Sequence, residues 1–122
     1  MKNEGACYMP YIYFVHDGVH HVKIGKSIYP DDRLKSLQTG NPNKLELLYL
    51  LSVKSEKAAL EIEEVLHEVL NDALVNGEWY SETSVLLLLT IPSFEIRGHL
   101  FCEQEEWNPK YHCYERKALL EC

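Results

Sequence analysis

The segment Tyr11-Ile-Tyr-Phe-Val15, followed a few residues later by Val22-Lys-Ile24, decides the fold of this chain. Both stretches are rich in aromatic and β-branched residues, which favour β-strands. Asp17-Gly18 lies between them, and this dipeptide is a strong signal for a hairpin loop. The sequence therefore predicts two antiparallel strands joined by a short connection.

The length of the hairpin loop decides which side chains share a face of the sheet. A two-residue turn would place Lys23 on the face away from Tyr13. A three-residue loop at 16–18 pairs Tyr13 with His21 and Tyr11 with Lys23. It also produces one apolar face, which is formed by Ile12, Phe14, Val22 and Ile24. Because this register sorts both faces, we expect a three-residue loop and a surface of phenols beside a cation.

The rest of the chain alternates between helical and strand patterns. Residues 30–38 begin with a proline and two acids and precede a glycine, which predicts a short helix. The apolar run at 45–53 predicts a third, central strand. Ser55 can cap a long helix that runs to about residue 74, and a shorter helix capped by Ser81 follows. Residues 94–101 could form another strand. The order β-β-α-β-α-α predicts a small α+β domain, with a three-stranded antiparallel sheet flanked by helices.

Length and charge limit the function classes. The chain has 122 residues, which suits one domain, and a formal net charge of −7. Residues 56–122 contain 14 acidic and five basic side chains. This acidic second half argues against a general nucleic-acid coat, because such proteins neutralise many phosphates. A local site for one phosphate in the first half remains open.

Two further features bear on location. The longest aliphatic run, Val85–Leu89, is far shorter than the roughly 18 residues that a membrane-spanning helix requires. Glu4 and Pro10 interrupt the only stretch that resembles a leader peptide. We therefore expect a cytoplasmic protein with no membrane partner.

The cysteines and the segment Gly25-Lys-Ser27 are candidates for a metal site and a nucleotide-binding loop, respectively. We expect reduced thiols, since no CxxC pair occurs among Cys7, Cys102, Cys113 and Cys122. An alternative is a zinc site, for which the four ligands would be His99, Cys102, His112 and Cys113. Gly25-Lys-Ser27 ends like a phosphate-binding Walker loop, but His20 stands where that pattern requires a glycine.

The long helix brings one carboxylate close to the core. Taken at ~100° per residue from Ile62, the apolar stripe spans about −60° to +80°, and Glu63 falls near 100°. Glu63 is therefore the glutamate nearest the buried edge of this helix. His67 lies one turn beyond it on the same flank.

Six short motifs in this order resemble those of the GIY-YIG nuclease superfamily. Tyr11-Ile-Tyr13 stands where the family has Gly-Ile-Tyr, and Lys23-Ile-Gly25 stands where it has Tyr-Ile-Gly. The Lys-Ile-Gly form is similar to that of a phage and bacterial subgroup. The other four motifs are Arg33-Leu34, Thr39-Gly-Asn-Pro42, Glu63-x-x-Leu-His67 and Gly77-Glu-Trp-Tyr80. The resemblance implies a GIY-YIG-like domain at 8–92 and a C-terminal extension at 93–122.

This resemblance implies metal-dependent hydrolysis of a DNA phosphodiester bond. In the family, the tyrosine that matches Tyr13 activates or orients the attacking water. The arginine that matches Arg33 steadies the scissile phosphate, and the glutamate that matches Glu63 holds one divalent ion. That ion is expected to be Mg²⁺ or Mn²⁺.

Residues near these three have expected roles of their own. On the same face as Tyr13, Lys23 is the candidate cation that would favour the ionised phenol. We expect Tyr13, Lys23, Arg33 and Glu63 to converge on one concave surface. The residues expected to contact nucleic acid are Tyr11, Lys26, Lys35 and His67.

A second hypothesis comes from another class of protein. In it, the chain is a catalytically silent module that keeps the phosphate pocket and binds nucleic acid, a nucleotide or a protein partner. The acidic second half and the extension at 93–122 favour this alternative, and the extension could contact a protein partner. Glu63 favours the enzyme, because a pure phosphate binder gains nothing from a carboxylate facing its anion.

Overall fold

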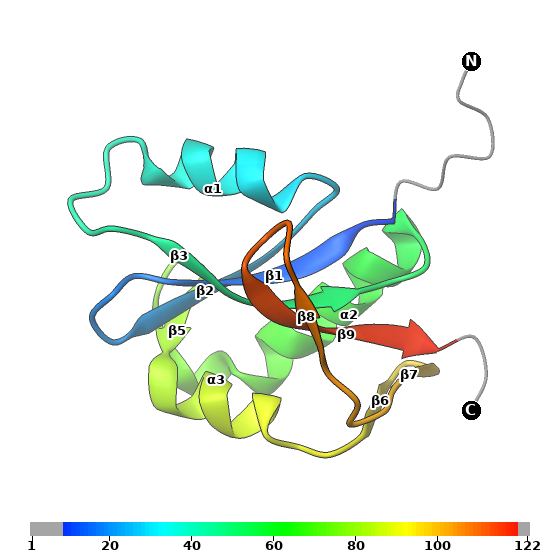
Figure 1. Cartoon of the computed structure of the whole chain (residues 1–122). Helices are drawn as coiled ribbons and strands as arrows, with labels where there is room; N and C mark the ends of the chain where they lie inside the picture. Colours follow the sequence, from blue (N-terminus) through cyan, green and yellow to red (C-terminus); the bar gives the residue numbers. More distant parts are fainter. Residues whose placement is uncertain (1–8, 120–122) are drawn as a thin grey trace.

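A computed structural model describes residues 9–119 of the chain. Its centre is an antiparallel sheet in which β1 (Tyr11–His16) lies between β2 (His21–Ser27) and β3 (Glu46–Ser52) (Figure 1). The two hairpin strands and the central strand are thus confirmed. Cys7 and Cys122 lie outside the described residues.

The sheet is larger than the three strands expected from the sequence. Within the described residues it has nine strands, eight of them in the order β4-β5-β2-β1-β3-β9-β7-β6, with β8 paired to β9. The additional strands are β4 (Leu74–Asn76), β5 (Trp79–Ser81), β6 (Phe94–Ile96), β7 (His99–Phe101), β8 (Glu106–Asn108) and β9 (Cys113–Leu119). Most are three residues long, which is too short for a clear alternating pattern. Strands β6 and β7 lie in the stretch 94–101, for which one strand was the expectation.

The helices follow the sequence closely. Helix α1 (Pro30–Gln38) has the expected bounds, and Ser55 caps α2 (Glu56–Val69) by accepting a hydrogen bond from the Ala58 N–H at 3.1 Å. Helix α2 ends earlier than expected, and a 3₁₀ turn (Asn71–Ala73) leads into β4. Helix α3 (Glu82–Leu89) forms without a side-chain cap from Ser81.

The helices cover opposite faces of the sheet, with α1 on one side and α2 and α3 on the other (Figure 1). On the face covered by α2, the buried residues are the even-numbered ones of the hairpin, namely Ile12, Phe14, Val22 and Ile24, together with Ile62 and Leu66 of α2. The other face buries Tyr13, Val15 and Leu50 beside Leu34 and Leu37 of α1. This division of the hairpin side chains matches the sequence prediction.

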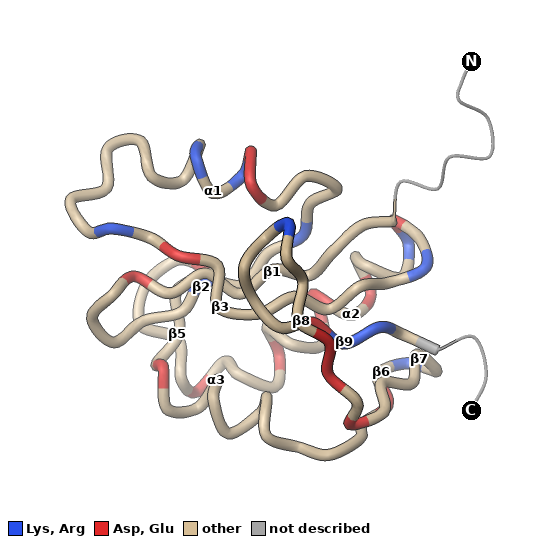
Figure 2. Tube along the Cα trace, viewed as in Figure 1, with Lys and Arg blue, Asp and Glu red and all other residues tan. Residues whose placement is uncertain are grey.

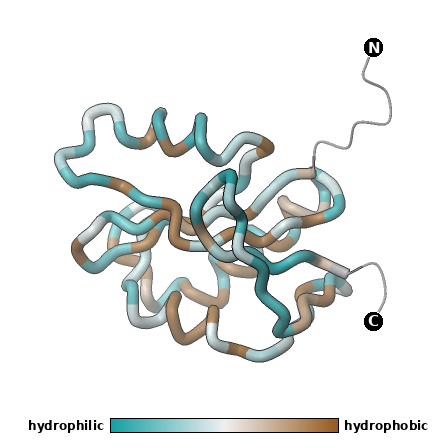
Figure 3. The backbone as a smooth tube through the Cα atoms, viewed as in Figure 1, coloured by the Kyte–Doolittle hydropathy of each residue, from teal (hydrophilic) through white to brown (hydrophobic). Residues whose placement is uncertain are grey.

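Helix α3 is hydrophobic along most of its length (Figure 3). Its residue Val85 is fully buried, whereas Leu86 and Leu87 are exposed. Val69 at the end of α2 is likewise 63% exposed. The hydrophobic pattern of these helices therefore predicts more buried residues than the structure has, because the sheet covers only one side of each helix.

The hairpin loop has three residues, as expected, but it lies at 18–20 rather than at 16–18. The backbone N–H of Asp17 donates to the His21 carbonyl at 3.0 Å, and Tyr13 lies opposite Gly25 rather than opposite His21. Lys23 lies opposite Val15 rather than opposite Tyr11. The loop length is odd in both registers, so Tyr13 and Lys23 still share a face.

Asp17 explains this register. One oxygen of its carboxylate accepts hydrogen bonds from the backbone N–H groups of Val19, His20 and His21. Gly18 follows with φ at 79°, a conformation that glycine adopts without a steric cost. Asp17 thus organises the loop from its first paired position instead of occupying the loop itself.

The C-terminal segment continues the central sheet. Strand β9 pairs in parallel with β3, and its residue Arg116 is almost completely buried. The Arg116 guanidinium donates to the carbonyl oxygens of Leu89, at the end of α3, and of Ile91 and Pro92, which follow it. Residues of the segment 93–119 are therefore packed against the domain rather than separate from it. Among residues 9–119, no helix combines the length and the apolar character that a membrane crossing requires.

Candidate functional site

Tyr13 and Arg33 form the first part of the candidate site. The phenol ring of Tyr13 lies so close to Gly25 that a Cβ atom at this position would overlap the ring and its hydroxyl group. Arg33, on α1, donates from Nε to the Tyr13 hydroxyl oxygen at 3.3 Å. This hydrogen bond raises the pKa of Arg33 above its usual value, so the guanidinium stays charged.

Lys23 has a different partner from the one expected. Its Nζ lies 2.7 Å from Oε1 of Glu78, and the hydrogen bond lowers the pKa of Glu78. The pairing of β2 with β5 explains this contact, because the backbone N–H of Ile24 bonds the Glu78 carbonyl. The cation bonded to Tyr13 is Arg33, so the expectation that Lys23 acts on this phenol is corrected.

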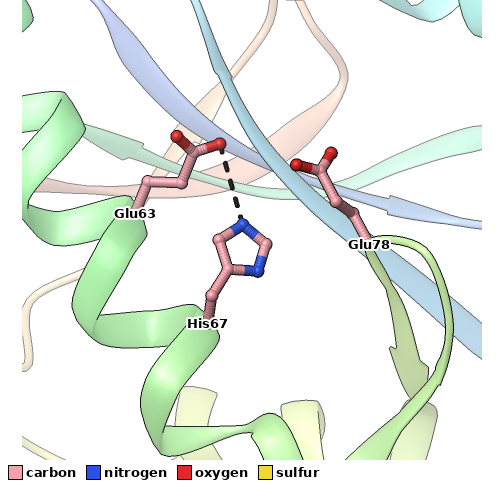
Figure 4. Close-up of side chains that lie close together, drawn as sticks. All are labelled: Glu63, His67 and Glu78. Atoms are coloured by element: carbon pink, nitrogen blue, oxygen red, sulfur yellow. Dashed lines mark ion pairs between the residues drawn. The ribbon is translucent and has the colours of Figure 1, made fainter.

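Glu63, His67 and Glu78 form the second part of the site (Figure 4). One ligand atom from each of these side chains lies within 4.8 Å of the others. Glu63 and His67 are four residues apart on α2, and Oε2 of Glu63 is 3.7 Å from Nε2 of His67. Glu78 reaches toward them from the turn before β5 (Figure 4). Three potential metal ligands thus meet at one point.

The two nitrogens of His67 have different surroundings. Nδ1 is hydrogen-bonded to the Tyr80 hydroxyl group, which orients the ring. Nε2 is buried and has no hydrogen-bond partner among the described residues, although two carboxylates are close. A buried nitrogen without a partner is costly unless a proton or a cation fills the gap. An imidazole and two carboxylates are suitable ligands for a divalent transition metal such as Mn²⁺.

The four residues expected to share one concave surface come from both sides of the sheet. Tyr13 belongs to the face covered by α1, whereas α2, which carries Glu63, packs on the opposite face. Glu78 connects the two groups, because its carboxylate bonds Lys23 and also lies beside Glu63 and His67. The site therefore extends from one face of the sheet to the other at the point where β5 begins beside β2.

The residues expected to contact nucleic acid lie in several places. Lys26 and Lys35 are exposed, at the end of β2 and on α1. Tyr11 is half-buried and touches the ring of Tyr111, with 5.6 Å between the centroids. His67 lies inside the carboxylate cluster instead of on an open surface.

Charge is unevenly distributed over the molecule. Acidic residues gather in the segment that leads into β8, whereas α1 and the β8–β9 loop carry Lys or Arg (Figure 2).

Neither Glu78 nor Tyr80 was expected in the site from the sequence. Their signal was present in the Gly77-Glu-Trp-Tyr80 motif, but nothing in the chain order shows that this turn faces α2.

The zinc alternative has no support in the described residues. Between 9 and 119, the group of three close His, Cys, Asp or Glu side chains is the one at Glu63, and it includes none of the four proposed zinc ligands. His99 instead pairs with Glu61 at 3.1 Å. Burial raises the pKa of the Cys113 thiol to about 11, as expected for a packed, unreactive thiol.

This α+β domain, with its Tyr–Arg pair and acidic cluster, is consistent with a phage-type, nuclease-associated domain. Residues 10–95 match the model of the T5orf172 domain, and the chain therefore belongs to this family, which is linked to GIY-YIG-type nucleases. The matched range contains both parts of the candidate site. Comparisons with curated proteins and with solved structures found no significant match.

Proposed function

We propose that this protein is a metal-dependent DNA endonuclease that hydrolyses a phosphodiester bond at this site. The observation that carries the proposal is the buried Nε2 of His67, which has no hydrogen-bond partner and lies between two carboxylates. An anionic substrate would not stabilise this arrangement, but a divalent cation would.

Glu63, His67 and Glu78 would hold the ion. When bound, it would supply Lewis-acid stabilisation of the charge that develops on the phosphate oxygens. Tyr80 keeps the His67 ring in place through its hydroxyl group. Carboxylates suit Mg²⁺ and Mn²⁺, while the imidazole favours the transition metal. We therefore extend the expected single ligand, Glu63, to three and place Mn²⁺ before Mg²⁺.

Arg33 and Tyr13 would act on the phosphate and on water. The Arg33 side chain is bonded through Nε, so both of its terminal nitrogens can donate to phosphate oxygens. Tyr13 is only 2% exposed, and its hydroxyl group reaches the site beside Gly25. Its role is to orient the guanidinium and the attacking water.

The silent binding module remains the second candidate, and two observations favour it. Lys23 already neutralises Glu78, and Tyr13 is almost completely buried. Both features leave fewer groups for catalysis. In this alternative, Arg33 would bind the phosphate of a nucleic acid, a nucleotide or a phosphorylated partner without cleaving it.

Nicking of supercoiled plasmid by the whole chain, with Mn²⁺ or Mg²⁺, tests the proposal. Glu63→Gln should abolish nicking and leave DNA binding unchanged or tighter, because it removes a negative charge near the phosphate at nearly constant shape. Glu64→Gln is the matched control, since Glu64 is the next residue of α2 and its side chain is 56% exposed. It should nick like the parent.

Two more variants separate the roles within the site. Arg33→Ala should weaken both binding and turnover, because the phosphate contact exists before and during the reaction. Tyr13→Phe should lower the rate alone. If the parent protein never nicks with either ion, or if Glu63→Gln nicks as well as the parent, the binding module becomes the better account.

A further inference from the structure

A cavity lies away from the carboxylate cluster and is lined by aromatic rings. Its volume is about 670 Å³, which lies within the range of ligand-binding pockets. Strand β1, the loop before α1, strand β8 and the β8–β9 loop form its walls. The rings that line it are Tyr11, Tyr29, Trp107 and Tyr111. Trp107 and Tyr111 lie in the segment after residue 95, beyond the range that matches the family.

The rings are held in place but remain partly open to solvent. Trp107 makes an edge contact with Tyr114 at 5.1 Å between centroids, and Tyr11 makes one with Tyr111. Even so, Trp107 is 52% exposed and Tyr29 is 50% exposed. Large exposed rings around one cavity provide surfaces on which flat aromatic ligands can stack.

The charged side chains that line the cavity are two carboxylates and two ammonium groups, and both carboxylates have partners. The Glu106 carboxylate is paired with Lys117 at 3.3 Å, and that of the buried Glu115 accepts a hydrogen bond from Asn108. Lys110 lies above the Tyr111 ring, with 5.2 Å from Nζ to the centroid. It forms no ion pair with a carboxylate of residues 9–119. One cation is thus available beside the rings.

The cavity also lies close to the Tyr13–Arg33 part of the site. Tyr11 and Tyr13 are two residues apart on β1, so both pack on the same face of the sheet. The carbonyl oxygen of Tyr29 accepts the backbone N–H of Arg33 at 3.1 Å. A strand whose phosphate contacts Arg33 therefore needs to extend by only one turn of α1 to reach the rings.

We propose that this aromatic cavity binds unpaired bases of a single-stranded DNA segment next to the bond that is cut. Unpaired bases can leave their stack and place their faces on tyrosine and tryptophan rings, whereas paired bases within a duplex cannot. Lys110 would contact the phosphate between them. The inference rests on the proposed function for the identity of the nucleic acid, and it makes branched or gapped DNA the substrate class.

Binding of a short fluorescein-labelled oligothymidine to the whole chain, measured by anisotropy in EDTA, tests this inference without cleavage. Trp107→Ala should weaken binding about 5- to 150-fold, as expected for the loss of one stacked base. Trp107→Phe, which retains a ring, should restore most of the affinity. Leu87→Ala, at an exposed position on α3 across the sheet, is the matched control and should bind like the parent.

Lys110→Gln provides a second variant that does not depend on ring packing. It should weaken binding and reduce the slope of log affinity against log salt by about 1. Lys57→Gln, an exposed lysine on α2, should leave the slope unchanged. Circular dichroism of each variant checks that the fold is intact.

Three results would overturn the inference: duplex DNA bound as tightly as oligothymidine, oligouridine bound more tightly than oligothymidine, or Trp107→Ala bound like the parent. Plasmid nicking reports separately on the proposed function. If the parent nicks and Trp107→Ala leaves oligothymidine binding unchanged, only this inference fails. If oligothymidine binding depends on Trp107 and no metal supports nicking, only the enzyme fails.

Discussion

Lys23 Nζ lies 2.7 Å from Oε1 of Glu78, and this ion pair joins the two parts of the candidate site. Lys23 comes from the face of the sheet that carries Tyr13, whereas Glu78 also approaches Glu63 and His67. A metal ion at the cluster would therefore compete with an ammonium group for one of its ligands. Measuring this competition tests whether the cluster binds a metal ion.

Replacing Lys23 should increase the affinity of the cluster for a divalent ion. In Lys23→Gln, the Glu78 carboxylate loses its partner and a positive charge near the ion disappears, so we expect Mn²⁺ to bind severalfold more tightly. Isothermal titration calorimetry with Mn²⁺ measures the change. Lys26→Gln, an exposed lysine on the same strand, should leave the affinity unchanged, and an unchanged Lys23→Gln would separate Glu78 from the ion.

Removing the hydroxyl group of Tyr80 should weaken metal binding without touching a ligand. The hydroxyl group bonds Nδ1 of His67 and fixes the ring, so Tyr80→Phe frees the ring to turn away from the ion. Residues that orient metal ligands typically contribute about 10- to 100-fold to affinity. The same Mn²⁺ titration reports the loss, with Tyr114→Phe as the control at an exposed tyrosine. Equal affinities of Tyr80→Phe and the parent would remove His67 from the ligand set.

A methyl group at position 25 should displace the phenol of Tyr13. The Cβ of Gly25→Ala would overlap the Tyr13 ring, and overpacking of this kind costs about 1–3 kcal/mol of unfolding free energy. Urea denaturation measures this loss of unfolding free energy. In a Tyr13→Ala background the ring is absent, and the same substitution should cost much less. Equal costs in the two backgrounds would show that the ring is not what excludes a side chain.

Acid should destabilise the hairpin through Asp17. Burial alone would raise the pKa of Asp17, but hydrogen bonds from His21 and Val19 outweigh it and lower the pKa to about 2. The folded state therefore favours the ionised carboxylate, and this stability is complete above pH 4 and disappears as pH falls toward 2. The shift from 3.8 corresponds to about 2 kcal/mol.

The variant Asp17→Asn provides the measurement. It should be less stable than the parent at neutral pH, and the difference in unfolding free energy should shrink as pH falls from 4 to 2. Asp31→Asn, on the exposed surface of α1, is the control. A difference that stays constant with pH would show that the charge of Asp17 does not contribute.

Local sequence was sufficient for much of this fold. The proline at position 30, the cap at Ser55 and the alternating hairpin residues act on neighbours within a few positions, so their effects are visible in the chain order. The same holds for the odd loop length, which followed from sorting apolar and polar residues onto two faces. Glu63 could be placed at the buried edge of α2 because helical spacing fixes its angle.

The tertiary structure decided what depends on distant segments. A hairpin loop at 16–18 and one at 18–20 place the same side chains on each face, so the hydrophobic pattern does not distinguish between them. The hydrogen bonds of Asp17 select the loop at 18–20. Strand β9 lies in parallel beside β3, and its buried Arg116 bonds carbonyl groups more than 20 residues earlier. Glu78 meets Glu63 and His67 because β5 pairs with β2, and such non-local pairing leaves no periodic signal in the sequence.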